Sequence, residues 1–134
     1  MKDFEIQFLD HVAIRVKNLE ESARWYVRVL GLKRLQPPEW GEFPILLLSG
    51  ETGIALFPAN TNDPPLDSSS KNVKIDHFAF NVTRENLGNA KKHYEELGIE
   101  YEFQDHIYYH SIYTRDPDGH QVELTSIIVD KAFY

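Results

Sequence analysis

The sequence repeats one short pattern, an Asp-His pair followed by alternating apolar residues, at two places half the chain apart. The first copy spans residues 10–16 (DHVAIRV) and the second spans residues 76–82 (DHFAFNV). The two histidines, His11 and His77, are 66 residues apart in a chain of 134. This internal duplication constrains the fold more than any other feature, because each copy is then expected to build the same small structural unit.

The first copy predicts a strand, a helix and three further strands. Asn18 with Glu21 three residues later is typical of a helix N-terminus, apolar residues then recur at helical spacing, and Gly31 ends the helix. Strands are predicted near residues 33–36, 45–49 and 53–57, with a hairpin turn at residues 50–52.

The second copy repeats this order of elements. Its helical stripe ends at Gly98, and its later strands are predicted near residues 100–103, 110–114 and 121–126. Residues 60–72, rich in Pro, Ser and Asn, are interpreted as a flexible connector. We therefore expect a single domain over residues 1–134, with one module at about 8–59 and the other at about 73–126.

Three potential metal ligands fall on the faces of the predicted strands that lie opposite the large apolar residues. Because side chains alternate along a strand, His11, His77 and Glu123 are all expected on such faces. A single strand histidine is more often structural than metal-binding, but two equivalent histidines and a carboxylate favour a metal site. The same alternation turns the side chains of Asp10 and Asp76 away from the face that carries the potential ligands, and we interpret them as strand-end residues.

Composition excludes several classes of function. The chain has no cysteine, so thiolate ligands, disulfides and cysteine nucleophiles are excluded together. A formal charge of −7 argues against general binding to nucleic acid phosphates. No apolar run approaches the roughly 20 residues that a membrane span needs, and the first residues lack a signal-peptide pattern. We expect a cytoplasmic protein that binds neither membranes nor nucleic acids.

Taken together, these motifs resemble the vicinal oxygen chelate superfamily, which includes glyoxalase I, extradiol dioxygenases, fosfomycin-resistance enzymes and bleomycin-resistance proteins. The resemblance covers about residues 8–126. It rests on the two histidine strands, on Trp25-Tyr26 through Leu30-Gly31-Leu32, and on Ile112-Tyr113 with Asp116-Pro117-x-Gly119 leading to Glu123. It implies an α+β fold, in which two βαβββ modules form an open, curved mixed sheet around a cavity that holds a divalent metal.

Four strand positions carry metal ligands in that superfamily, and they match His11, Ala55, His77 and Glu123 here. Ala55 cannot bind a metal, which departs from glyoxalase I. The remaining two histidines and one carboxylate resemble the ligand sets of extradiol dioxygenases and fosfomycin-resistance enzymes. Such a set leaves metal positions open for substrate, and it favours Fe²⁺ or Mn²⁺, with Zn²⁺ or Ni²⁺ as alternatives.

The resemblance also implies two catalytic residues. Tyr113 is expected to face inward with Ser111, and His106 lies in a segment that resembles an extradiol-dioxygenase signature, which Gln104 interrupts. Fosfomycin-resistance enzymes usually carry a threonine where this chain has Ala13, and a basic C-terminal segment where it has residues 127–134.

Two functions follow as alternatives. The first is a homodimeric metalloenzyme that binds a small oxygen-bearing substrate at the metal, by dioxygenase, lyase, isomerase or thiol-transfer chemistry. The second is a non-catalytic small-molecule binder resembling the bleomycin-resistance proteins. Retention of His11, His77 and Glu123 favours the enzyme, because a metal-free binder has no need of all three.

Overall fold

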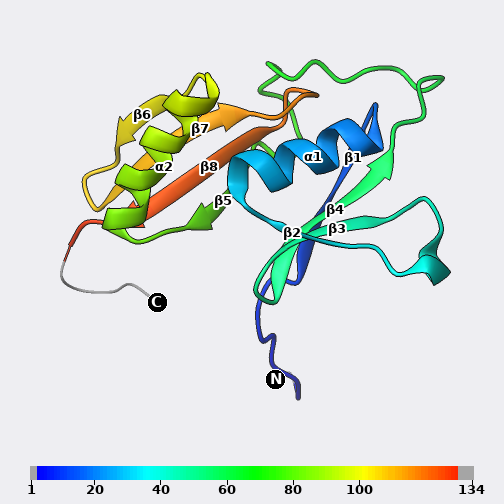
Figure 1. The fold of residues 1–134 in the computed structure, drawn as a ribbon, viewed down its shortest axis with the longest axis horizontal. Helices are drawn as coiled ribbons and strands as arrows, with labels where there is room; N and C mark the ends of the chain where they lie inside the picture. The colour runs from blue at the N-terminus through cyan, green and yellow to red at the C-terminus, as the bar shows by residue number, and fades with distance from the viewer. Residues whose placement is uncertain (1–2, 130–134) are drawn as a thin grey trace. The chain divides into compact units, whose positions relative to one another are not determined.

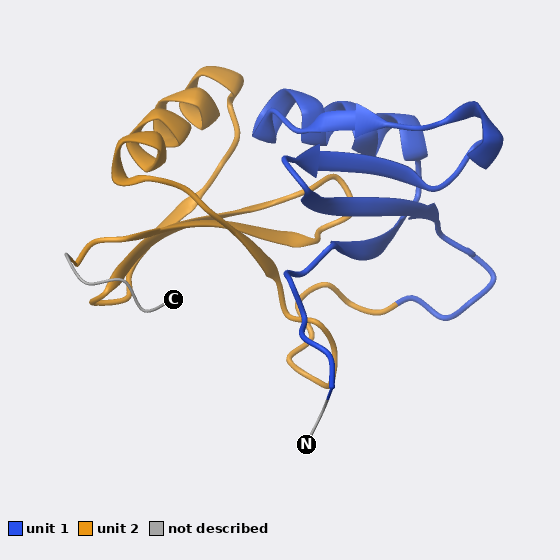
Figure 2. Ribbon diagram, turned by 90° about the horizontal axis from the view of Figure 1, so that it is seen from below, with its two compact units in different colours: residues 1–65 blue, residues 66–134 orange. Residues whose placement is uncertain are grey.

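The computed structural model describes residues 3–129 and divides the chain into unit 1, residues 1–65, and unit 2, residues 66–134 (Figure 2). Within the described residues, each unit packs one α-helix against its own four-stranded mixed sheet. The element order in both units is strand, helix and three strands. The predicted α+β class, with two βαβββ modules and open mixed sheets, is confirmed.

Unit 1 contains β1 (His11–Val16), α1 (Leu19–Leu30), β2 (Lys33–Leu35), the 3₁₀ turn η1 (Pro38–Trp40), β3 (Ile45–Ser49) and β4 (Thr52–Pro58) (Figure 1). The strands are ordered β1-β4-β3-β2, with β1 parallel to β4 and the other pairs antiparallel. The edge strand β1, which carries His11, is thereby fixed against β4.

The helix α1 begins and ends where the sequence predicts. The side chain of Asn18 accepts a hydrogen bond from the backbone N–H of Glu21 at 2.9 Å, and Gly31 ends the helix with a φ of 68°. Its buried residues Ala23, Tyr26 and Val29 lie on the side that contacts β3 and β4. Burial of this apolar stripe is the main force that holds the helix to the sheet.

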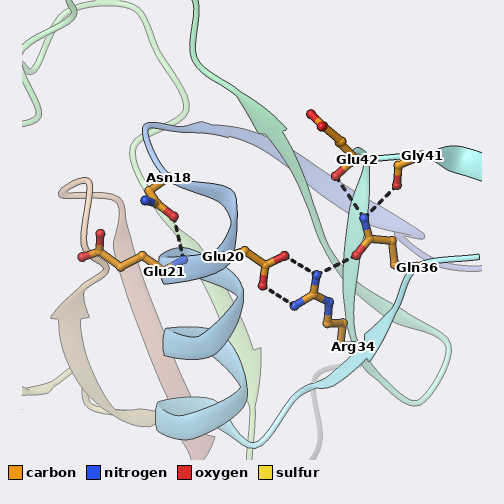
Figure 3. A network of polar contacts seen from close by, with 7 residues as sticks. All are labelled: Asn18, Glu20, Glu21, Arg34, Gln36, Gly41 and Glu42. Atoms are coloured by element: carbon orange, nitrogen blue, oxygen red, sulfur yellow. Dashed lines mark hydrogen bonds and ion pairs between the residues drawn. The ribbon is translucent and has the colours of Figure 1, made fainter. Parts of the chain in front are cut away.

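A polar network ties the start of α1 to β2 and to the loop after it (Figure 3). The guanidinium of Arg34 donates to both carboxylate oxygens of Glu20, at 2.7 and 2.8 Å, and to the side chain of Gln36. The amide of Gln36 in turn donates to the carbonyls of Gly41 and Glu42. Hydrogen bonds from Arg34 lower the pKa of the Glu20 carboxyl. This network orders an irregular loop that has little buried apolar surface of its own.

Unit 2 contains β5 (Phe78–Asn81), α2 (Arg84–Leu97), β6 (Glu102–Asp105), β7 (Tyr109–Arg115) and β8 (Gln121–Ile127). Its strand order, β5-β8-β7-β6, matches that of unit 1, and β5 is parallel to β8. Thr83 caps α2 by accepting from the N–H of Asn86, and Gly98 ends the helix. The helix ends at the predicted glycine, whereas β6 begins at Glu102 rather than at residue 100.

The core of unit 2 contains one polar atom without a partner. Tyr94 on α2 is 1% exposed, and within residues 3–129 its buried hydroxyl has no hydrogen-bond partner. Burial raises the pKa of this phenol. An unsatisfied buried hydroxyl costs about 1–3 kcal/mol.

We therefore expect Tyr94→Phe to raise the free energy of unfolding by about 1 kcal/mol, since the ring stays and only the unpaired hydroxyl is lost. Urea unfolding curves of the variant and the wild type measure the difference. Tyr101→Phe is the matched control, because the Tyr101 hydroxyl donates to Glu95 at 2.7 Å and its loss should not stabilise the protein. A Tyr94→Phe variant less stable than the wild type would show that the hydroxyl has a partner.

Candidate metal centre

The structure brings four of the five predicted site residues together on unit 2. Glu123 on β8 lies directly opposite Tyr113 on β7. The Nε2 atom of His77 lies 2.8 Å from Oε1 of Glu123, and Nε2 of His106 lies 2.9 Å from the hydroxyl of Tyr113. The rings of His77 and Tyr113 meet edge to face at 5.7 Å.

Both nitrogens of His77 contact a carboxylate. Its Nδ1 atom lies 2.7 Å from Oδ2 of Asp76, while Nε2 faces Glu123. An ionised carboxylate only accepts hydrogen bonds, so each contact is a hydrogen bond where the ring nitrogen that it joins carries the proton. The hydrogen bond from His77 lowers the pKa of the Asp76 carboxyl. Asp76 lies before the start of β5 at Phe78, consistent with its interpretation as a strand-end residue, but strand alternation does not govern the two residues before the strand, and its carboxylate contacts His77.

His11, the fifth predicted residue, lies in unit 1 and likewise contacts the aspartate that precedes it. Its Nδ1 atom lies 2.7 Å from Oδ2 of Asp10, which precedes the first residue of β1. Asp10 thus lies at a strand end, as predicted, and its carboxylate contacts the imidazole of the next residue, as that of Asp76 does. Within the described part of unit 1, the Nε2 atom of His11 has no hydrogen-bond partner, so its lone pair is available to a ligand.

The equivalence of Ala55 and Glu123, predicted from the repeat, is visible in the strand registers. In unit 1 Ala13 pairs with Ala55, and in unit 2 Ala79 pairs with Glu123. The next residue across the sheet is Leu46 in unit 1 and Tyr113 in unit 2. Unit 1 therefore carries apolar side chains where unit 2 carries a carboxylate and a phenol.

The donor atoms of His77 and Glu123 suit a divalent cation. Glu123 is 7% exposed, and a buried carboxylate is expected to be paired with a proton donor or a cation. Nε2 of His77 and Oε1 of Glu123, 2.8 Å apart, would both be available to hold such an ion. Neither unit by itself holds three or more His, Asp or Glu side chains in a metal-binding group among residues 3–129.

Tyr113 is placed to act as a hydrogen-bond donor. Its partial burial, together with the negative charge of Glu123, raises its pKa to about 12. The phenol consequently keeps its proton at neutral pH. An O–H group beside a carboxylate and two imidazoles can stabilise negative charge that develops on a bound oxygen atom.

His106 reaches Tyr113 from the turn between β6 and β7. The next residue, Ile107, has a φ of 72°, which is uncommon for a β-branched side chain. Its N–H donates to Oδ1 of Asp105 at 2.9 Å, and the N–H of His106 donates to the carbonyl of Tyr109 at 2.8 Å. These bonds fix the turn in a strained conformation, as is frequent beside functional groups.

In the part of the chain that the structure describes, no helix has both the length and the apolar character required to cross a membrane.

Known proteins share this arrangement of elements and much of this sequence pattern. The family model described as Glyoxalase/Bleomycin resistance protein/Dioxygenase superfamily matches residues 8–124. The chain is 30% identical over 121 residues to a protein named Glyoxylase I 4 from Arabidopsis thaliana, an alignment that covers 87% of this chain and 68% of that protein. It is 28% identical to glutathione transferase FosA of Serratia marcescens, with coverage of 89% and 80%.

Solved structures share the fold. The crystal structure of a glyoxalase/dioxygenase from Nostoc punctiforme superimposes with a TM-score of 0.80 and 20% identity, covering 96% of this chain and 97% of that one. At this level of identity, the match supports the fold alone.

Proposed function

This chain belongs to the glyoxalase/bleomycin resistance protein/dioxygenase superfamily, and on that basis we propose that it is a metal-dependent enzyme acting on a small oxygen-bearing substrate. The proposed metal ligands are His77 and Glu123 of unit 2 and His11 of unit 1, from the same chain or from a second copy. A divalent ion bound there would act as a Lewis acid toward substrate oxygens. Fe²⁺ or Mn²⁺ is favoured, because two imidazoles and one carboxylate leave several positions open on a six-coordinate ion.

The observation that carries this proposal is the repeated Asp-His contact. In both units an aspartate contacts Nδ1 of the predicted ligand at 2.7 Å, which leaves Nε2 as the nitrogen that could bind the metal. In unit 2 that Nε2 is already directed at the buried carboxylate of Glu123. A histidine that only fills space in a core needs neither arrangement.

The side chains around these ligands have separate roles in the proposed reaction. Tyr113, protonated at neutral pH, donates a hydrogen bond to a substrate oxygen that gains negative charge. His106, at 2.9 Å from the Tyr113 hydroxyl, orients that phenol and exchanges a proton with it or with the substrate.

Calorimetric titration of metal-free protein tests the proposal directly. We expect about one Mn²⁺ or Fe²⁺ ion per chain, bound more selectively than Ca²⁺, which prefers six to eight oxygen ligands. Loaded protein is then screened for isomerase, lyase, dioxygenase and thiol-transfer reactions. Glutathione-dependent reactions come first, because a relative is named a glutathione transferase. A protein that binds small molecules but no metal would instead support the non-catalytic binder.

We further propose that the protein works as a homodimer. The strands β1, β2, β5 and β6 are sheet edges within their own units, and unpaired edges invite pairing with other strands. Apolar side chains precede both histidine strands and are largely exposed: Phe4, Ile6, Leu9, Val73 and Ile75.

Sedimentation velocity at micromolar concentration should show a species of about twice the 15.6 kDa chain mass. A double substitution of Ile6 and Leu9 by Ser should shift the population toward the single chain. A single 15.6 kDa species for the unmodified protein over the whole concentration range would contradict the dimer.

A further inference from the structure

The contact between an aspartate and the histidine that follows it is present in both units, whereas the proposed carboxylate ligand is present only in unit 2. The aspartate that precedes each histidine approaches Nδ1 to 2.7 Å, through Asp10 in unit 1 and Asp76 in unit 2. Two other corresponding positions differ between the two sheets, with Ala55 in place of Glu123 and Leu46 in place of Tyr113. The Asp-His contact is thus present whether or not a carboxylate faces Nε2.

We infer that Asp10 and Asp76 are positioning residues, which fix the tautomer and the ring orientation of His11 and His77 so that Nε2 carries the lone pair for the metal. The inference rests on the proposed function, and it assigns a role to two residues that do not bind the metal themselves. A carboxylate that accepts from Nδ1–H holds the imidazole ring in one orientation and increases the basicity of the other nitrogen.

A stabilising role in folding does not account for these contacts. The side chains of Asp10 and Asp76 are 77% and 54% exposed, and polar pairs that are this exposed to water contribute little to stability. Each pair also joins neighbouring residues in the chain, so it cross-links no distant elements. Loss of the carboxylate should accordingly leave the free energy of unfolding almost unchanged. It should instead alter the tautomer and the ring orientation of the imidazole.

His11 gives the cleaner test, because its Nε2 atom has no hydrogen-bond partner among the described residues of unit 1, whereas Nε2 of His77 faces Glu123. Two-bond ¹H–¹⁵N correlation spectra of metal-free protein, at a pH where imidazole is neutral, report which nitrogen carries the proton. We expect the Nδ1–H tautomer for His11 in the wild type and a shift toward Nε2–H in Asp10→Ala. Asp10→Asn should retain the wild-type tautomer, because the amide oxygen still accepts a hydrogen bond.

Metal affinity is the second measurement. Asp10→Ala and Asp76→Ala should each weaken Mn²⁺ binding by about 10–100-fold in calorimetric titrations, and the corresponding Asn variants by less. Asp67→Ala is the matched control: it removes the same charge from an exposed loop of unit 2, where the carboxylate contacts Ser69 and not a histidine. We expect it to bind Mn²⁺ as the wild type does.

The two measurements separate this inference from the proposed function. If the wild type binds no metal, the proposed function fails, while the tautomer of His11 still reports on Asp10. If the wild type binds Mn²⁺ and Asp10→Ala and Asp76→Ala bind it equally well, the positioning role is refuted. An unchanged His11 tautomer in Asp10→Ala would refute it as well.

Discussion

His77→Ala should lose divalent metal binding at micromolar concentrations, the largest effect that we expect from any single substitution. Removing the imidazole takes away one of three proposed ligands and the neighbour of a buried carboxylate, since Nε2 lies 2.8 Å from Glu123. Structural zinc sites with four ligands bind their ion with a free energy of about 10–16 kcal/mol, which is roughly 3 kcal/mol per ligand. Loss of one ligand should therefore lower metal affinity by about 10²-fold. Calorimetric titration with Mn²⁺ measures the loss.

Glu123→Gln provides the corresponding test of the carboxylate. The amide keeps the size of the side chain but lacks the negative charge, so metal affinity should fall by a similar factor. Glu102→Gln is the control. Glu102 on β6 pairs with Tyr113 on β7, which in turn pairs with Glu123 on β8, so Glu102 and Glu123 lie on the same face of the sheet and two strands apart. Metal binding by His77→Ala that equals the wild type would show that unit 2 does not hold the ion.

The parts of this fold that depend on local chain chemistry were predictable from the sequence. The cap at Asn18 and the glycines at the ends of both helices are set by hydrogen bonds between close neighbours in sequence. The two matching copies, compared with the ligand positions of the superfamily, also identified Ala55 as the counterpart of Glu123, which the strand registers bear out. A repeat supplies this information because two copies of one unit share one register.

The contacts of Asp10 and Asp76 were not predictable by the same reasoning. Strand alternation describes side chains inside a regular strand, but β1 begins at His11 and β5 at Phe78, so both aspartates precede the regular part. There the short carboxylate side chain reaches the imidazole of the next residue. The contact between His106 and Tyr113 also depends on the conformation of the turn at Ile107, which a side-chain pattern does not reveal.

Tyr113→Phe should lower turnover by on the order of 10²-fold while leaving metal binding intact. The substitution keeps the ring, and with it the edge contact to His77 at 5.7 Å, and removes only the hydroxyl. Because burial and the charge of Glu123 raise the pKa of Tyr113 to about 12, the lost group is a proton donor at neutral pH. Removal of one donor to a developing oxyanion typically costs about 10²–10³-fold in rate.

The measurement is steady-state kinetics with the substrate found in the screen of loaded protein, combined with Mn²⁺ titration of the same sample. Tyr109→Phe is the matched control, because Tyr109 lies on the same strand and the same face of the sheet, opposite Ile127. If Tyr113 fills space only, both variants should turn over substrate at the wild-type rate. That result would move the catalytic assignment to His106, whose Nε2 atom contacts the Tyr113 hydroxyl in this structure and would then act on substrate directly.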